Sequence, residues 1–184
     1  YLVRMNGIDQ SYHAANVLHR GATSPMLDPL NVRYIVLPRD VPPGRPDLLH
    51  LSQRYPTVYV DATVRVVEKT DGLPRAWVVH TARTATDDEA LDLLATSAVD
   101  PAAEAILPAD ETAPELSQPA DPAAERVTIT ARGADEMTLS VELGAPGIVV
   151  LSEIWDPDWT VEVDGEDVEL LRVDGILRGV AVPA

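Results

Sequence analysis

The last third of the chain alternates hydrophobic and polar residues with a period of two. Val127 and Ile129 are separated and followed by threonines in the segment RVTITAR, a pattern typical of a half-buried β-strand. Further on, Asp164-Gly165 and Asp174-Gly175 each stand between short hydrophobic segments. Asp-Gly favours a tight hairpin, because both central positions of such a turn need positive φ. We therefore predict an antiparallel β-sandwich of about six or seven short strands over 126–184.

The first part of the chain mixes strand-like and helix-like patterns. Segments rich in β-branched and aromatic residues predict strands at 31–37, 57–60, 63–69, 75–80 and 105–107. The clearest helix is predicted over 86–95, where Thr86 and Glu89 have the spacing of a capping box. A short helix is also expected over 9–18, with Gly21 placed to end it. These elements predict an α+β unit over 1–107.

A change of composition separates these two parts. Residues 108–125 contain four prolines among Ala, Ser, Asp and Glu. Prolines remove backbone donors and the acidic side chains repel one another, so we expect an extended or mobile linker that is poor in regular hydrogen bonds. The predicted organisation is thus a mixed α/β unit at 1–107, an acidic linker at 108–125 and a β-sandwich at 126–184, which is an α+β fold overall.

The net charge of −16 and the pI near 4.4 restrict the possible partners. Proteins that bind nucleic acid need clustered Lys and Arg to displace counterions, so we expect no nucleic-acid partner. The same charge argues against electrostatic docking on anionic lipid. There is no cysteine, and no hydrophobic run reaches the roughly 18 residues that predict a membrane-spanning helix. Since the chain begins at Tyr1, we expect a mature form or a piece excised from a longer protein.

The candidate chemistry is concentrated in one cluster, Trp155-Asp156-Pro157-Asp158-Trp159. Two indoles beside two carboxylates can stack on a sugar ring and accept its hydroxyl hydrogens, or hold Ca²⁺. The alternative is structural: the tryptophans pack on the sheet and Asp-Pro-Asp makes a turn. An EF-hand is excluded because Val161 stands where that loop needs glycine.

No catalytic motif accompanies this cluster. The four histidines lack metal-ligand spacing and no serine has a nucleophile-elbow context. The acidic residues Asp164, Glu166 and Asp167 fit hairpin chemistry better than a metal site. We expect no catalytic residue, no metal and no cofactor in this chain.

Four stretches form an ordered set: PLNVRYIV at 29–36, GLPRAWVV at 72–79, VLSEIWDPDW at 150–159 followed by VDG, and LRVDGILRGV at 171–180. In this order and spacing they resemble the YfhO family of bacterial and archaeal multi-spanning membrane proteins, which are similar to GT-C-type glycosyltransferases. The chain departs from the family pattern at one turn, where Asp156-Pro157-Asp158-Trp159 stands in place of Tyr-Pro-Gly-Trp.

The resemblance implies a non-catalytic extracytoplasmic domain of a polytopic, glycosyltransferase-like protein at the cell membrane, excised as a soluble fragment. Its implied partners are its own membrane-spanning portion and a glycan or lipid-linked sugar, for which Trp155, Asp156, Asp158 and Trp159 are the candidate contacts. No catalytic residue of the family matches a position here. The alternative is a free-standing β-sandwich module that binds carbohydrate or protein, and a cytosolic enzyme is the third possibility.

Overall fold

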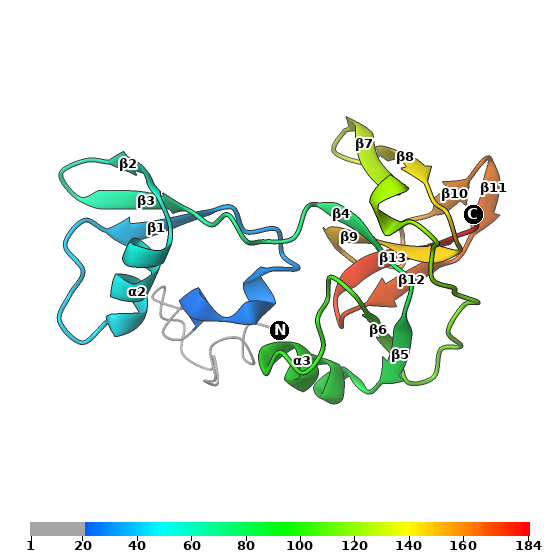
Figure 1. Cartoon of the computed structure of the whole chain (residues 1–184), viewed down its shortest axis with the longest axis horizontal. Helices are drawn as coiled ribbons and strands as arrows, with labels where there is room; N and C mark the ends of the chain where they lie inside the picture. Colours follow the sequence, from blue (N-terminus) through cyan, green and yellow to red (C-terminus); the bar gives the residue numbers. More distant parts are fainter. Residues whose placement is uncertain (1–20) are drawn as a thin grey trace. The chain divides into compact units, whose positions relative to one another are not determined.

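The computed structural model describes residues 21–184, so the helix expected over 9–18 lies outside the described residues. The chain divides into two compact units, with the division between Leu73 and Pro74. We refer to them as the first unit and the second unit (Figure 1). Within residues 21–184, both are built mainly from antiparallel strands with one short α-helix each, and the α+β fold class is confirmed.

The first unit is a three-stranded antiparallel sheet with a helix on one face. The strand order is β1-β3-β2. Its elements are the 3₁₀ turns η1 (Gly21–Thr23) and η2 (Pro25–Leu27), the strands β1 (Tyr34–Pro38), β2 (Thr57–Val60) and β3 (Val64–Glu68), and the helix α2 (Pro46–Arg54). The three strands confirm the predictions at 31–37, 57–60 and 63–69.

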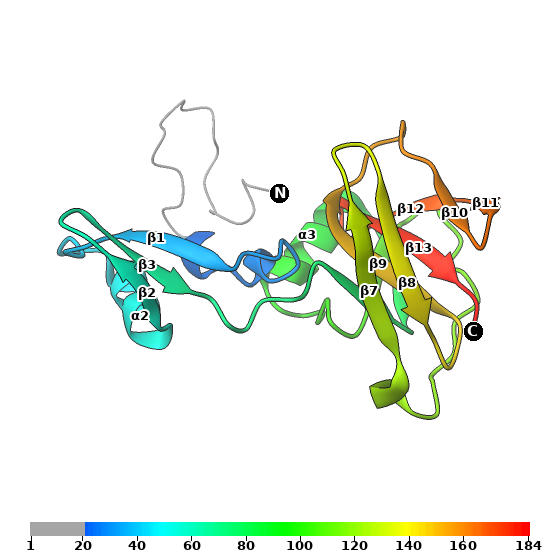
Figure 2. The same cartoon turned by 90° about the horizontal axis from the view of Figure 1, so that it is seen from above.

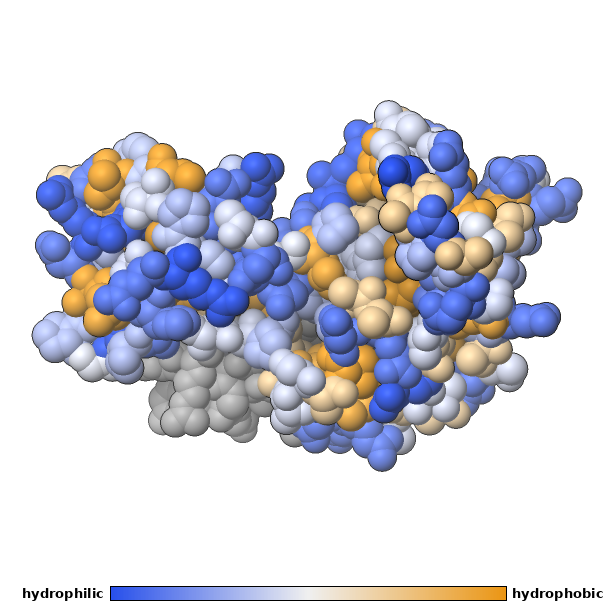
Figure 3. Space-filling model, viewed as in Figure 1, coloured by the Kyte–Doolittle hydropathy of each residue, from blue (hydrophilic) through white to orange (hydrophobic). Residues whose placement is uncertain are grey.

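Helix α2 was not predicted, because the prolines that precede it indicated only a loop. The loop ends at Arg45 and the helix starts with Pro46, a position where the missing N–H costs nothing. Asp47 in the first turn and Arg54 in the last turn complement the helix dipole. Leu48 and Leu51 face the sheet and are buried with Leu37, Tyr55 and Val67. Hydrophobic side chains also reach the surface over β2, at the upper left of Figure 3.

The second unit contains a four-stranded antiparallel sheet in the order β12-β13-β9-β4. The strands are β4 (Ala76–Val79), β9 (Gly147–Ile154), β12 (Leu170–Val173) and β13 (Leu177–Val182). The first five residues of β9 are all buried, which is the pattern of a strand covered on both faces rather than one. The ribbon of β7 (Arg126–Arg132) and β8 (Met137–Glu142) lies against this sheet (Figure 2).

A strand-helix-strand segment completes this unit. Strands β5 (Ala82–Ala85) and β6 (Ala105–Pro108) pair in parallel, and the connection between them includes α3 (Asp87–Ala95). Thr86 and Glu89 form the predicted capping box. The remaining elements are the hairpin of β10 (Val161–Val163) and β11 (Glu166–Val168), and the 3₁₀ turn η3 (Pro122–Ala124). Neither α-helix in the described residues is long and hydrophobic enough to cross a membrane.

The division of the chain differs from the predicted boundaries at 107 and 126. Residues 126–184 do form seven strands with only antiparallel pairings. However, β9 also pairs with β4, with Trp77 opposite Val150. The earlier segment AWVV therefore belongs to the same sheet as the last third of the chain.

Residues 108–125 belong to the second unit and do not separate the two units. Apart from the first residue and η3 they contain no helix or strand, as predicted. They are nevertheless attached to the sheet: Ser117 N donates to Pro146 O at 3.3 Å, and His80 Nε2 lies 2.9 Å from Glu125 Oε2. The His80 and Glu125 side chains are only 8% and 5% exposed. These two contacts fix the segment at Ser117 and Glu125 without forming a regular ladder of hydrogen bonds.

Both predicted Asp-Gly turns are confirmed, but their environments differ. Asp164 and Asp174 have φ of 53° and 52°, and the glycine after each also has positive φ. Asp164 is exposed, whereas Asp174 is fully buried. Its Oδ1 accepts a hydrogen bond from Ile106 N at 3.0 Å, and its Oδ2 has no partner. Burial raises the pKa of the Asp174 carboxyl to about 7, although the Ile106 hydrogen bond acts in the opposite direction.

Candidate functional site

The predicted cluster forms the turn that follows β9 and precedes β10. Asp156 organises this turn, since its Oδ1 accepts from Asp158 N at 2.9 Å and its carbonyl accepts from Trp159 N at 3.2 Å. Both carboxylates are exposed. Asp156 therefore makes the turn, as the structural alternative predicted. Its carboxylate and that of Asp158 nevertheless face solvent.

Trp155 anchors the turn to the neighbouring hairpin. Its indole Nε1 donates to Leu170 O at 3.2 Å, and its backbone N donates to Ile176 O at 2.8 Å. The side chain is half-buried. Trp155 thus holds the turn in place while part of its ring stays open to solvent.

Trp159 is also half-buried, and it is stacked by an arginine. The guanidinium carbon of Arg178 lies 3.9 Å from the Trp159 ring centroid, and Arg178 Nε donates to Ile154 O at 2.8 Å. Burial lowers the pKa of Arg178, while the charges of Glu153 and Asp156 act in the opposite direction. Arg178 has no ion-pair partner within residues 21–184, so its terminal nitrogens remain available to a ligand.

Two further arginines gather beside this pair. Arg75 and Arg132 both bind Glu153 Oε1, at 2.7 and 3.2 Å. The charge of Glu153 also acts on Arg178, so three of the six arginines in the second unit interact with this one carboxylate. This makes the site locally rich in cations within a strongly acidic unit.

The arginines were missed by sequence reasoning. Arg178 reaches the turn because the pairing of β13 with β9 shifts register between Leu177 and Arg178. Such bulges re-aim a side chain. The hairpin pattern around Asp174-Gly175 predicts β13, but no local signal predicts which residue of β9 it faces.

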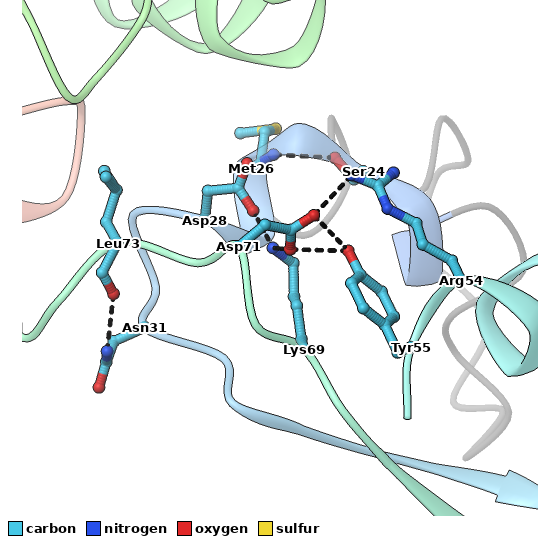
Figure 4. A network of polar contacts seen from close by, with 9 residues as sticks. All are labelled: Ser24, Met26, Asp28, Asn31, Arg54, Tyr55, Lys69, Asp71 and Leu73. Atoms are coloured by element: carbon cyan, nitrogen blue, oxygen red, sulfur yellow. Dashed lines mark hydrogen bonds and ion pairs between the residues drawn. The ribbon is translucent and has the colours of Figure 1, made fainter. Parts of the chain in front are cut away.

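A second polar cluster lies in the first unit and involves the only lysine of the chain (Figure 4). Lys69 Nζ binds Asp28 Oδ1 and, at 2.6 Å, Asp71 Oδ1. Tyr55 donates its hydroxyl to Asp71 Oδ1 at 2.7 Å, and Arg54 binds Asp71 Oδ2 at 2.5 Å. The cluster connects the segment after η2 to the end of β3 and the end of α2.

The charges in this cluster compensate one another. Burial disfavours the Lys69 ammonium, but its hydrogen bonds to Asp28 and Asp71 outweigh this effect and raise the pKa of Lys69. Burial likewise disfavours the Asp71 carboxylate, yet the hydrogen bonds from Lys69 and Tyr55 lower its pKa to about 2. A lysine held in its charged form cannot act as a nucleophile or a base, so this arrangement is a structural brace.

The other acidic residues considered from the sequence do not assemble into a site. Asp164, Glu166 and Asp167 lie exposed on the β10–β11 hairpin. Within residues 21–184, no group of three or more His, Asp or Glu side chains has an arrangement that could hold a metal ion. The turn with Arg178 therefore remains the candidate site. No family model, no curated protein and no solved structure matches this chain.

Proposed function

We propose that this chain is a non-catalytic extracytoplasmic domain of a polytopic, glycosyltransferase-like membrane protein, and that it contacts a glycan or lipid-linked sugar at the Trp155–Trp159 turn. The observation that carries the ligand part is the half-exposed Trp159 ring stacked by Arg178, with the exposed carboxylates of Asp156 and Asp158 on the same turn.

The chemistry of these groups suits a sugar that carries an anionic group. Apolar C–H faces of a sugar pack on an indole, and Asp156 and Asp158 can accept hydrogen bonds from its hydroxyls. Arg178 presents a planar donor fork that matches a phosphate, and Arg75 and Arg132 add positive charge nearby. Among the two ligand classes considered, this favours the lipid-linked sugar, whose linkage contains phosphate, over a neutral glycan.

The membrane part of the proposal rests on the resemblance to the YfhO family. The stretches at 72–79, 150–159 and 171–180 contain strands or parts of strands of one sheet, β4, β9 and β12–β13. These three stretches are far apart in the sequence and are neighbours in one structural unit, whereas the stretch at 29–36 lies in the first unit. Reading the gene upstream of Tyr1 tests this part, since the proposal requires several hydrophobic segments of about 20 residues there.

The ligand part predicts a specific loss on substitution. We expect a water-soluble sugar phosphate to change tryptophan emission, and Trp159→Ala to weaken its binding about tenfold, because the stacking platform is removed. Arg178→Lys should weaken the binding of the sugar phosphate by a similar factor, since the ammonium cannot bind phosphate bidentately. It should leave the affinity for the neutral sugar unchanged. Calorimetric titration of each variant with both sugars measures this.

The matched control is Arg83→Ala, which removes an exposed arginine paired with Glu104 elsewhere in the second unit. It should bind like the unchanged chain. If Arg83→Ala weakened binding of the sugar phosphate equally, the effect of Arg178 would be one of overall charge and not of this turn. If neither sugar changed the heat or the tryptophan emission, binding at this turn would be refuted.

A further inference from the structure

The first unit exposes an unusual amount of hydrophobic side chain. Of the eight large hydrophobic residues that are exposed in the described chain, six belong to this unit. Val36 on β1 is 65% exposed and Tyr59 on β2 is 54% exposed. Exposed hydrophobic patches of this kind mark interaction surfaces.

Strand register places several of these side chains on one face. Val36 is opposite Val66, and Val66 is opposite Tyr59, so the three form a row across β1, β3 and β2. Residues directly opposite each other in antiparallel strands point to the same side of the sheet. Leu37 and Val67 point to the other side, where they are buried against α2. The row therefore lies on the face away from the helix, together with Tyr34, and we call it the outer sheet face.

The charge of the chain is distributed unevenly between the units. Residues 1–73 contain eight basic and seven acidic side chains, whereas 74–184 contain six basic and 23 acidic ones. The first unit thus carries a net charge of +1 and the second −17. The argument against a lipid surface that follows from the total charge applies to the second unit only.

The sheet has two edges, β1 and β2, and the β2 edge is poorly suited to adding a strand from another protein. β2 is an edge strand, but its pairing is interrupted by a bulge between Thr57 and Tyr59, and bulges blunt an edge against strand addition. The outer face instead combines Tyr34 and Tyr59 with aliphatic residues and the exposed Arg33, whose guanidinium lies 5.3 Å from the Tyr34 ring centroid. Tyrosine and arginine beside aliphatic side chains are typical of the headgroup region of a bilayer.

We propose that the outer sheet face docks on the headgroup region of a lipid bilayer, with Val36 and Tyr59 inserting among the headgroups. The attraction is apolar, because the first unit is nearly neutral, and the acidic second unit is repelled from anionic lipid. This surface goes beyond the sugar contact, uses different residues and is tested without any sugar.

The test is co-flotation of the whole chain with vesicles. We expect the chain to float with phosphatidylcholine vesicles, and to float less with vesicles that contain anionic phosphatidylglycerol at low salt, with the difference decreasing as salt screens the second unit. The double variant Val36→Thr, Tyr59→Ser should partition at least about tenfold less, because its exposed apolar area is reduced.

Two control variants make the result specific. Val168→Thr changes an exposed hydrophobic residue of the second unit, and Arg178→Lys changes the sugar site; both should float like the unchanged chain. If the double variant loses hydrogen-exchange protection in β3, the single Tyr59→Ser variant replaces it.

Three outcomes would overturn the proposal. One is the absence of flotation with either vesicle, and another is equal flotation of the wild type and the variants of the outer face. The third is sedimentation of the unchanged chain as a dimer that the double variant dissociates, because the face would then bind a second copy.

Discussion

Asp174→Asn is expected to stabilise the second unit by about 2 to 4 kcal/mol at about pH 8. The folded chain holds this fully buried carboxyl protonated up to a pH of about 7, whereas the ordinary value is 3.8. The stability that the protonated group contributes is therefore complete below pH 3.8 and is lost as the pH rises toward 7. An asparagine stays neutral at every pH and tolerates the positive φ of this position.

The measurement is urea unfolding followed by tryptophan fluorescence between pH 5 and 8. All three tryptophans, at 77, 155 and 159, lie in the second unit, so this signal reports on the unit that contains Asp174. The stability difference between variant and wild type should grow as the pH rises. Asp164→Asn is the matched control, since Asp164 has nearly the same φ but is exposed. A difference that does not change with pH would contradict a protonated Asp174.

Lys69→Met should destabilise the first unit by about 3 kcal/mol. The side chain of Lys69 is 7% exposed, and removal of one partner from a buried ion pair leaves the remaining charges uncompensated. Asp28 and Asp71 are partly exposed, and Asp71 keeps its contacts with Arg54 and Tyr55, which places the expected loss at the lower end for such pairs.

Hydrogen exchange of the β1 and β3 amides measures this loss, and tryptophan fluorescence serves as the internal control for the second unit. Arg33→Met is the matched variant, because Arg33 pairs with Glu68 on the same sheet but is 68% exposed. It should cost far less than Lys69→Met, because solvent screens an exposed ion pair. Equal effects of the two substitutions would show that burial of Lys69 does not determine the strength of the brace.

Elements with a local chemical signal were predictable from the sequence. The Asp-Gly turns could be predicted because positive φ at two successive residues restricts the choice of side chain, and α3 because Thr86 and Glu89 are spaced to cap each other. Helix α2 was missed because Pro46 reads equally as the end of a loop and as the first residue of a helix. The division of the chain into units could not be predicted from local sequence patterns, because it depends on the pairing of β4 with a strand about 70 residues later.

In the candidate site, too, only the residues that are neighbours in the sequence could be predicted. The residues of the turn follow one another in the sequence, so Trp155 to Trp159 could be found as a cluster. Arg75 precedes β4, Arg132 ends β7 and Arg178 lies on β13, so the three arginines are far apart in the sequence. Only the tertiary structure brings Arg75 and Arg132 to Glu153, and Arg178 to Trp159. The buried state of Asp174 likewise depends on Ile106, which is 68 residues away in the sequence.

The pairing of β4 with β9 determines where this protein can be trimmed. A piece that begins near 126, as the composition of the chain suggests, lacks β4 and leaves β9 with an unpaired edge of eight residues, five of them normally buried. A long hydrophobic edge of this kind recruits strands from other molecules, so such a piece should aggregate during expression. A piece that begins at Pro74 keeps the neighbours of β9 on both sides and avoids this hazard.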